Sequence, residues 1–114
     1  AVFGASDLIA MGVIYAAEEA GLRVPDDLAV VGHDDREFSH LMRPGITTVR
    51  MPCREMGQVA AETLVEVIDG KIDEPGPILV PGELIVRQSC GGSDEPWRPD
   101  RECITLPCDL FAGG

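Results

Sequence analysis

The pattern of residues 1–35 constrains the fold more than any other part of the chain. After a few small or apolar residues, an apolar pattern of helical period extends over residues 7–20. Gly21 follows it, and glycine readily takes the left-handed conformation that ends helices, while Pro25 prevents continuation. Residues 28–32 are apolar on both faces and rich in valine, which is typical of a buried parallel strand. This stretch therefore predicts a strand, a helix and a second strand, joined by a right-handed crossover.

Polar residues follow each of the two predicted strands. Ser6 and Asp7 follow the first, and His33, Asp34 and Asp35 follow the second. Ligands of open α/β sheets bind at the edge where the carboxyl ends of the strands meet. A carboxylate there can accept hydrogen bonds from sugar or nucleoside hydroxyls, and such charge-assisted bonds are about twice as strong as neutral ones. The alternative is local: the carboxylates cap the following turn, Ser6 caps the helix, and the charge of Asp7 favours the helix N-terminus.

The rest of the chain predicts short elements separated by Pro and Gly. Residues 36–42 are expected to form a loop or a short helical turn, and residues 46–50 a short strand or an extended link. A second helix is expected from residue 53 or 54 to residue 69, followed by a glycine stop at Gly70. Residues 78–80 and 83–87 predict two further short strands, separated by a Pro-Gly pair.

Both predicted helices carry apolar stripes. In the first helix, the stripe with core spacing consists of Ile9, Val13, Ala16 and Ala20. A second stripe on a different face of that helix consists of Leu8, Met11 and Tyr15. In the second helix, a single stripe consists of Met56, Ala60, Leu64, Val67 and Ile68. The first helix is therefore expected to be covered on two sides, by its own sheet and either by a second layer of the same domain or by another subunit.

Several motifs in order also carry a family resemblance. The runs A-S-D-L-I-A-M-G, E-A-G-L-R-V-P-D-D-L-A-V-V-G-H-D-D, R-P-G-I-T-T-V-R and E-L-I-V-R-Q-S together resemble the C-terminal third of a LacI/GalR-type transcription regulator. The resemblance covers about residues 1–90. It implies an α/β fold, in which the chain is part of a periplasmic-binding-protein-like effector domain with a parallel sheet and flanking helices. It also implies that the chain is a fragment, incomplete without upstream residues.

The resemblance divides the chain between two lobes. Residues 1–49 and 83–90 would belong to the lobe distal to DNA and residues 53–80 to the proximal lobe, with crossings near residues 50–52 and 81–82. Residues 91–114 depart from the family pattern. Because glycine, proline and charged residues dominate their first half, we expect them to form a disordered tail.

The resemblance also assigns site residues. Asp34 matches the first Asp of the family's G-x-D-D motif and is the expected effector contact, whereas Asp35 is expected to cap. Ser6 aligns with a position where many members carry a contacting Asn. Met51 and Cys53 match positions that carry a polar and an aromatic contact in several sugar-binding members. Neither is polar or aromatic here, which argues against a sugar stacked on a ring at that position.

Two further expectations concern the crossing and the subunit contact. Arg50, at the lobe crossing, could hold an anionic group with its fork of donors, or be solvated. Regulators of this type dimerise through the helix that corresponds to residues 7–20. The predicted dimer interface therefore consists of Leu8, Met11, Tyr15 and Met42.

Charge and composition restrict the partners. The net charge of −11, from 20 acidic and 9 basic residues, argues against a nucleic-acid surface in this chain, because phosphate binding depends on Lys and Arg. Operator DNA would be bound only by an N-terminal helix-turn-helix segment that is absent here. Without an apolar run of 18 residues, we expect no membrane span. The resemblance to transcription regulators implies a cytoplasmic location.

The cysteine pattern favours reduced thiols. The four cysteines, Cys53, Cys90, Cys103 and Cys108, include no C-x-x-C pair. A cytosolic regulator would keep them reduced, with Cys53 a small and mostly buried apolar residue. A disulfide or zinc role is the alternative.

The predicted function is the effector-binding and dimerisation part of a LacI-type regulator. A small molecule, a sugar or a nucleoside-like compound, would bind between the lobes of a homodimer and control operator binding. No catalytic residue, cofactor or metal is expected. One rival is a periplasmic sugar-binding protein of a transporter, and another is a truncated product without function. A metal-dependent hydrolase built on His33, His40, Asp34 and Asp35 is a third rival, although ligands at successive positions rarely converge on one ion.

Overall fold

The computed structural model of the chain describes residues 1–92. Strand β1 (Val2–Phe3), helix α1 (Asp7–Glu19) and strand β2 (Val30–Val31) form the predicted strand-helix-strand unit. The two strands are parallel, with Val2 opposite Val30 and Phe3 opposite Val31. Gly21 follows the helix with a φ of 74°, the left-handed conformation expected of a glycine stop. The predicted order of strand, helix and parallel strand is confirmed, although β2 is shorter than residues 28–32.

A third strand extends the parallel arrangement. Strand β3 (Thr48–Arg50) runs parallel to β2 and to the residues that follow β2. Two bridges connect them, one between Val31 and Thr47 and the other between Asp34 and Arg50. The β2 segment therefore lies between β1 and β3. Strand β4 (Glu83–Ile85) then pairs with β3 in the antiparallel direction, a pairing that sequence patterns did not predict.

The core lies between α1 and this sheet. Its buried apolar residues are Ala10, Ile14 and Ala17 of α1 with Val30 and Ile46. The predicted core stripe of Ile9, Val13, Ala16 and Ala20 is wrong: Ile9, Ala16 and Ala20 are exposed and Val13 is only partly buried. The buried face is set instead by Asp7, whose fully buried carboxylate turns the residues three, seven and ten positions later toward the sheet.

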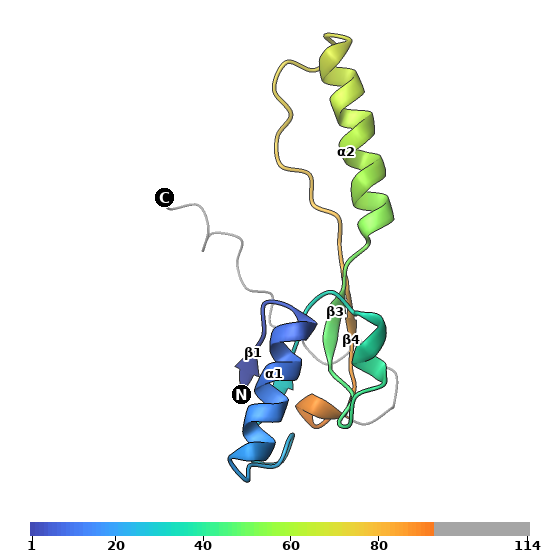
Figure 1. Cartoon of the computed structure of the whole chain (residues 1–114). Coiled ribbons are helices and arrows are strands. Elements are labelled where there is room, and N and C mark those ends of the chain that lie inside the picture. The colour runs from blue at the N-terminus through green and yellow to red at the C-terminus, as the bar shows by residue number, and fades with distance from the viewer. Residues whose placement is uncertain (93–114) are drawn as a thin grey trace.

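Residues 53–80 extend away from the rest of the molecule (Figure 1). We call them the arm, and we call residues 1–50 and 83–92 the body. The arm consists of helix α2 (Cys53–Ile68) and an extended return segment alongside it. The boundaries predicted for this helix are confirmed, and Gly70 has the left-handed φ of 69° expected of its stop.

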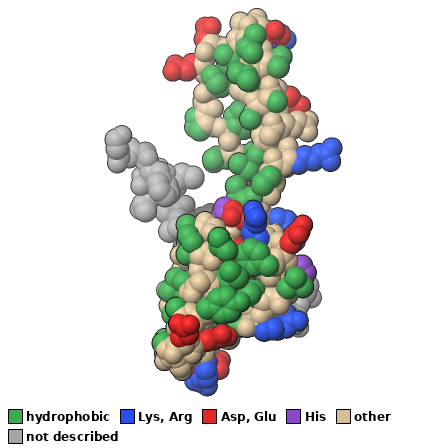
Figure 2. Space-filling model, viewed as in Figure 1, with side chains coloured by type: hydrophobic (Ala, Val, Ile, Leu, Met, Phe, Trp, Pro, Cys, Tyr) green, Lys and Arg blue, Asp and Glu red, His purple; other side chains and the backbone are tan. Residues whose placement is uncertain are grey.

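No residue of α2 is buried, and its apolar face is open. Met56, Leu64 and Ile68 are exposed, and a groove of about 530 Å³ separates the helix from Ile78 and Val80. The strand predicted at residues 78–80 is wrong, because no neighbouring strand in the described part of the chain pairs with this segment. Hydrophobic side chains accordingly lie on the surface of the arm as well as over the body (Figure 2).

Two short 3-10 helices complete the body. Helix η1 (Glu37–His40) lies within the helical turn predicted for residues 36–42, and helix η2 (Gln88–Cys90) follows β4. Among residues 1–92, no helix is long and apolar enough to cross a bilayer. Except for Gly91 and Gly92, the predicted tail lies outside the described residues, as do Cys103 and Cys108.

Candidate functional site

The carboxyl ends of the three parallel segments meet at one edge of the sheet. The Asp7 amide donates to the His33 carbonyl oxygen at 2.8 Å, and the Asp34 amide donates to the Val49 carbonyl oxygen at 2.9 Å. These bonds bring Ser6, Asp34 and Met51 to the same edge. The backbone thus groups three of the four residues predicted to contact an effector. They lie at the carboxyl edge of the sheet, where open α/β sheets bind ligands.

Ser6 caps helix α1. Its Oγ accepts a hydrogen bond from the Ile9 amide at 3.3 Å, and its backbone has the extended conformation of an N-cap residue. The capping interpretation of Ser6 is therefore confirmed. A role as an effector contact stays a prediction.

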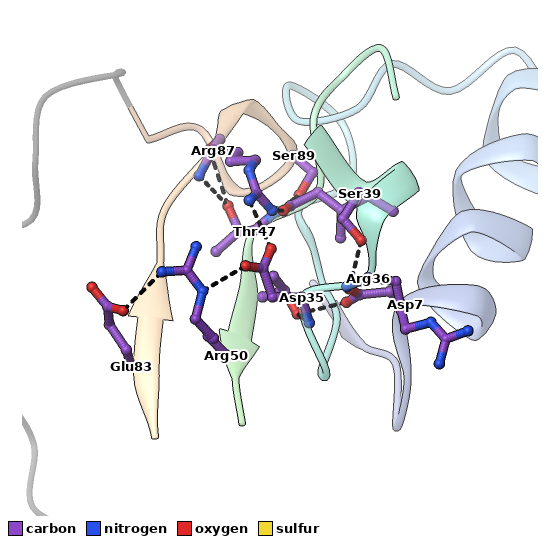
Figure 3. Close-up of polar contacts among 11 residues, drawn as sticks. Asp7, Asp35, Arg36, Ser39, Thr47, Arg50, Glu83, Arg87 and Ser89 are labelled. Carbon is purple, nitrogen blue, oxygen red and sulfur yellow. Dashed lines mark hydrogen bonds and ion pairs between the residues drawn. The ribbon is translucent and has the colours of Figure 1, made fainter. Parts of the chain in front are cut away.

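Asp7 is the buried anchor of this edge (Figure 3). Its side chain is fully buried, and it accepts hydrogen bonds from the Arg36 amide at 2.7 Å and from the hydroxyls of Ser39 and Thr48, each at 2.5 Å. The interpretation of Asp7 as a charge that only favours the helix N-terminus is incomplete. One carboxylate joins α1, the turn after β2, η1 and β3, and so fixes the loops that carry the edge residues.

Asp34 presents its carboxylate to solvent at this edge. The side chain is 42% exposed, and its Oδ1 lies 3.1 Å from Nδ1 of His33, which is the neighbouring residue. The backbone of Asp34 has a φ of 107°, a region that residues other than glycine rarely adopt. An exposed carboxylate held at a sheet edge can accept hydrogen bonds from the hydroxyls of a ligand.

Asp35 lies between two guanidinium groups, those of Arg50 and Arg87 (Figure 3). Its side chain is 10% exposed; Arg50 Nε lies 2.8 Å from one carboxylate oxygen and Arg87 Nη2 lies 2.7 Å from the other. Burial alone raises the pKa of Asp35, but the hydrogen bonds and charges of Arg87 and Arg50 outweigh burial and lower the pKa below its ordinary value. The predicted capping role is wrong, because η1 has no side-chain cap and both oxygens of Asp35 engage arginines.

Arg50 connects the edge to the start of the arm. It ends β3, and besides Asp35 it contacts Glu83 Oε2 at 3.1 Å. The hydrogen bond with Asp35 raises the pKa of Arg50 above its ordinary value, so the guanidinium remains charged. The side chain is 52% exposed. Arg50 is therefore neither fully solvated nor directed at an empty anion site, but held between two carboxylates.

Sequence reasoning missed Arg87 and Ser89 as structural parts of the site. Arg87 donates to the Ile46 carbonyl oxygen at 2.8 Å as well as to Asp35. Ser89 is fully buried, donates to the Val30 carbonyl oxygen at 2.6 Å and accepts from the Thr47 amide at 2.8 Å. Both lie in the R-Q-S run, whose only signal was the family resemblance. Their hydrogen bonds join the segment that follows β4 to β2 and to the residues that precede β3.

Met51 and Cys53 lie where the body meets the arm. Met51 is half-buried and Cys53 is exposed, so the prediction of a mostly buried Cys53 is wrong. This exposure follows from the position of Cys53 at the first turn of α2, which has no buried residue. The two residues line an open groove of about 470 Å³ together with Pro52, Arg54, Glu55 and Gln58. Among residues 1–92, no aromatic ring lines this groove.

Two other sequence predictions concern a subunit interface and a metal site. The residues of the predicted interface form a surface that we call the α1 patch: Leu8 is 62% exposed, Tyr15 is exposed, and Met11 and Met42 are partly buried. The Tyr15 hydroxyl lies 4.0 Å from the Met42 sulfur. Within residues 1–92, no three His, Cys, Asp or Glu side chains are grouped as a metal site, so the hydrolase alternative gains no support.

The fold and this edge are those of α/β proteins that bind ligands at the carboxyl ends of parallel strands. Comparison with known sequences identifies a family of that kind. The family described as the periplasmic binding protein-like domain matches residues 1–90, and the chain belongs to this family. The expected resemblance to LacI/GalR-type regulators is confirmed by individual relatives. The HTH-type transcriptional repressor PurR of Escherichia fergusonii is 40% identical over 101 residues, which are 89% of this chain and 29% of the relative.

Solved structures give the same result. A complex of the transcriptional regulator CelR with cellobiose is 39% identical and matches with a TM-score of 0.70, over 77% of this chain and 27% of that one. The Lac repressor bound to ONPG in the repressed state is 36% identical, with a TM-score of 0.69 over 76% of this chain and 26% of that one. The chain thus spans less than a third of the length of these relatives.

Proposed function

We propose that the chain is part of the effector-binding and dimerisation domain of a cytoplasmic LacI/GalR-type transcription regulator. A small molecule with hydroxyl groups, either a sugar or a nucleoside-like compound, binds between two lobes. Its binding favours one arrangement of the lobes and thereby changes how a dimer presents its DNA-binding segments to operator DNA. Those segments belong to a part of the protein N-terminal to this chain.

The observation that carries this proposal is the exposed carboxylate of Asp34 at the carboxyl edge of the sheet. The edge is built on the buried hydrogen bonds of Asp7, so its geometry is defined before any ligand binds. Ligand sites of this class are largely preformed and combine a few polar groups with apolar walls. Met51 directly follows Arg50, whose backbone is bridged to Asp34, and it lines an open groove at the start of the arm. The CelR relative was solved with a sugar, cellobiose.

The division into two lobes is supported by the separation of body and arm. The body contains the buried core, whereas the arm has an apolar helix face without a buried residue. We propose that residues 1–49 and 83–90 belong to one lobe and residues 53–80 to the other. The missing part of the second lobe would cover α2, since an exposed apolar face of this length is unfavourable in water.

Dimerisation through the α1 patch is the second part of the proposal. Leu8 and Tyr15 place large apolar side chains on the outer face of a helix whose inner face already packs on the sheet. Their burial in a twofold interface would remove this apolar surface from water. The acidic net charge of the chain supports a location of the DNA contacts outside it.

A DNA-binding experiment on the full-length protein tests the proposal. Fluorescence anisotropy would measure its affinity for labelled DNA from upstream of its own gene and for a scrambled duplex, with and without cellobiose, lactose, ribose or adenosine. We expect specific binding to the first duplex and a change of about tenfold or more with one compound, the usual size of allosteric coupling. Equal affinity for both duplexes, or a secretion signal at the protein's N-terminus, would overturn the regulator proposal.

A further inference from the structure

Residues 34 and 35 form a turn that is unfavourable for their side chains. Asp34 has a φ of 107° and Asp35 a φ of 52°, and neither is glycine. Aspartate tolerates the left-handed region better than most residues, but two such residues in succession persist only where surrounding contacts hold them. The contacts of this turn therefore determine where the Asp34 carboxylate is presented.

The strongest of those contacts are made by Asp35. Arg50 and Arg87 approach its two carboxylate oxygens from different elements, one from the end of β3 and the other from the segment after β4. Arg87 is itself fixed by its bond to the Ile46 carbonyl oxygen, and its side chain is only 16% exposed. The Asp35 amide also donates to the Thr48 hydroxyl at 3.2 Å. The turn is thus connected both to β3 and to the segment that follows β4.

Asp34 has weaker connections. Its amide donates to the Val49 carbonyl oxygen, but the only side-chain contact that its carboxylate makes within the described residues is with His33. The direction of the Asp34 side chain consequently depends on the backbone of the turn.

We propose that Asp35 is the positioning residue of the ligand site. Its ion pairs with Arg50 and Arg87 hold residues 34–35 in the left-handed turn that presents the Asp34 carboxylate to a hydroxylated ligand. The assignment of Asp34 as the ligand contact rests on the proposed function. The claim that Asp35 holds the turn is independent of the proposed function and can be tested without a ligand.

Hydrogen exchange of the full-length, ligand-free protein tests the holding of the turn. The key variant is Asp35→Asn, which keeps the shape of the side chain and removes its charge. The matched control is Glu83→Gln, which removes the other carboxylate of Arg50 and leaves Asp35 intact. We expect the peptide that covers residues 33–36 to exchange about tenfold faster in Asp35→Asn, because the turn opens locally, and to be unchanged in Glu83→Gln. Exchange in α1 should not change in either variant.

A milder variant serves if Asp35→Asn does not fold. Arg50→Gln removes the more exposed of the two ion pairs and leaves Arg87 in place. We expect a smaller increase of exchange in the same peptide. Unchanged exchange at residues 33–36 in the folded variants, or an equal increase in α1, would overturn the proposal, because Asp35 would then have either no role or a general structural one.

Calorimetric titration separates this proposal from the proposed function. With the compound of the panel that changes DNA binding, we expect Asp35→Asn to raise the Kd about tenfold and Glu83→Gln to leave it within about twofold. If the wild type responds to the compound and Asp35→Asn binds it equally well, the positioning role is refuted while the regulator stands. If the wild type does not bind DNA specifically, the regulator is refuted and the exchange result alone decides the role of Asp35.

Discussion

Gly32 lies directly against Asp7: a β-carbon at residue 32 would overlap Oδ1 of the Asp7 carboxylate and lie 3.2 Å from the β-carbon of Ala10. Helix α1 therefore approaches the sheet at a distance that requires glycine at this position. Because the Asp7 carboxylate also holds Ser39 and Thr48, any displacement of α1 disturbs the base of the ligand edge.

Gly32→Ala should lower the free energy of unfolding by about 1–3 kcal/mol, the usual cost of overpacking a core. Urea denaturation of the full-length protein measures this change. Gly12→Ala is the control, because an added β-carbon there has no atom within 4 Å. In a helix interior it should be neutral or stabilising by up to about 1 kcal/mol. Equal stability of Gly32→Ala and the wild type would show that the contact relaxes at no cost.

Asp7→Ala should be more damaging. It removes the acceptor of three hydrogen bonds and leaves the hydroxyls of Ser39 and Thr48 without their carboxylate partner in a buried site. We expect a loss of about 3 kcal/mol in the free energy of unfolding, from the same denaturation experiment. Asp26→Ala, at an exposed carboxylate, should change stability by less than about 0.5 kcal/mol. A loss at Asp7 as small as that at Asp26 would refute the anchoring role.

The lowered pKa of Asp35 should make the stability of the protein depend on pH. Its folded-state pKa lies below the ordinary value of 3.8, so its ion pairs stabilise the folded state fully above that pH. Their contribution should disappear as the pH falls from about 4 through the lowered pKa. Denaturation midpoints between pH 7 and pH 3 should therefore decline less steeply in Asp35→Asn than in the wild type. Parallel curves for the two proteins would contradict the lowered pKa.

Leu8→Glu should weaken dimerisation of the full-length protein without unfolding it. Leu8 is 62% exposed in the described chain, so a carboxylate there disturbs the fold little but would be buried in a twofold contact. Removing a large apolar side chain from a buried interface costs about 1.5–3 kcal/mol, equivalent to a dimer dissociation constant at least tenfold higher. Sedimentation velocity measures the change. Lys71→Glu, an exposed residue outside the α1 patch, should leave the profile unaltered. An unchanged profile for Leu8→Glu would show that the α1 patch is not the dimer interface.

Local signals in the sequence were sufficient for the main elements. The N-cap at Ser6, the glycine stops at Gly21 and Gly70 and the two helical periods predicted α1 and α2 within one or two residues of their observed bounds. Helical period alone did not identify the buried face of α1, because Ile9 and Val13 are more hydrophobic than Ala10 but the buried hydrogen bonds of Asp7 orient the helix.

The site was predictable only where it depends on strand ends. Asp34 and Ser6 follow strands, so their common edge could be predicted from the order of elements. The role of Asp35 could not, because its partner Arg87 lies 52 positions away and comes near only through the pairing of β3 with β4. Arg87 and Ser89 carried no local pattern of their own. The strand expected at residues 78–80 failed for a related reason, since strands form only where a neighbouring strand completes their hydrogen bonds.

The most direct test of the central claim is the affinity of the full-length Asp34→Asn variant for the compound that alters DNA binding by the wild type. Asparagine has nearly the shape of aspartate but lacks the charge that strengthens hydrogen bonds from ligand hydroxyls. Calorimetric titration should show a Kd about 10- to 100-fold higher than that of the wild type, corresponding to the loss of charge-assisted hydrogen bonds, with DNA affinity in the absence of ligand retained. An unchanged Kd would mean that the ligand binds elsewhere, and the assignment of this sheet edge as the effector site would be wrong.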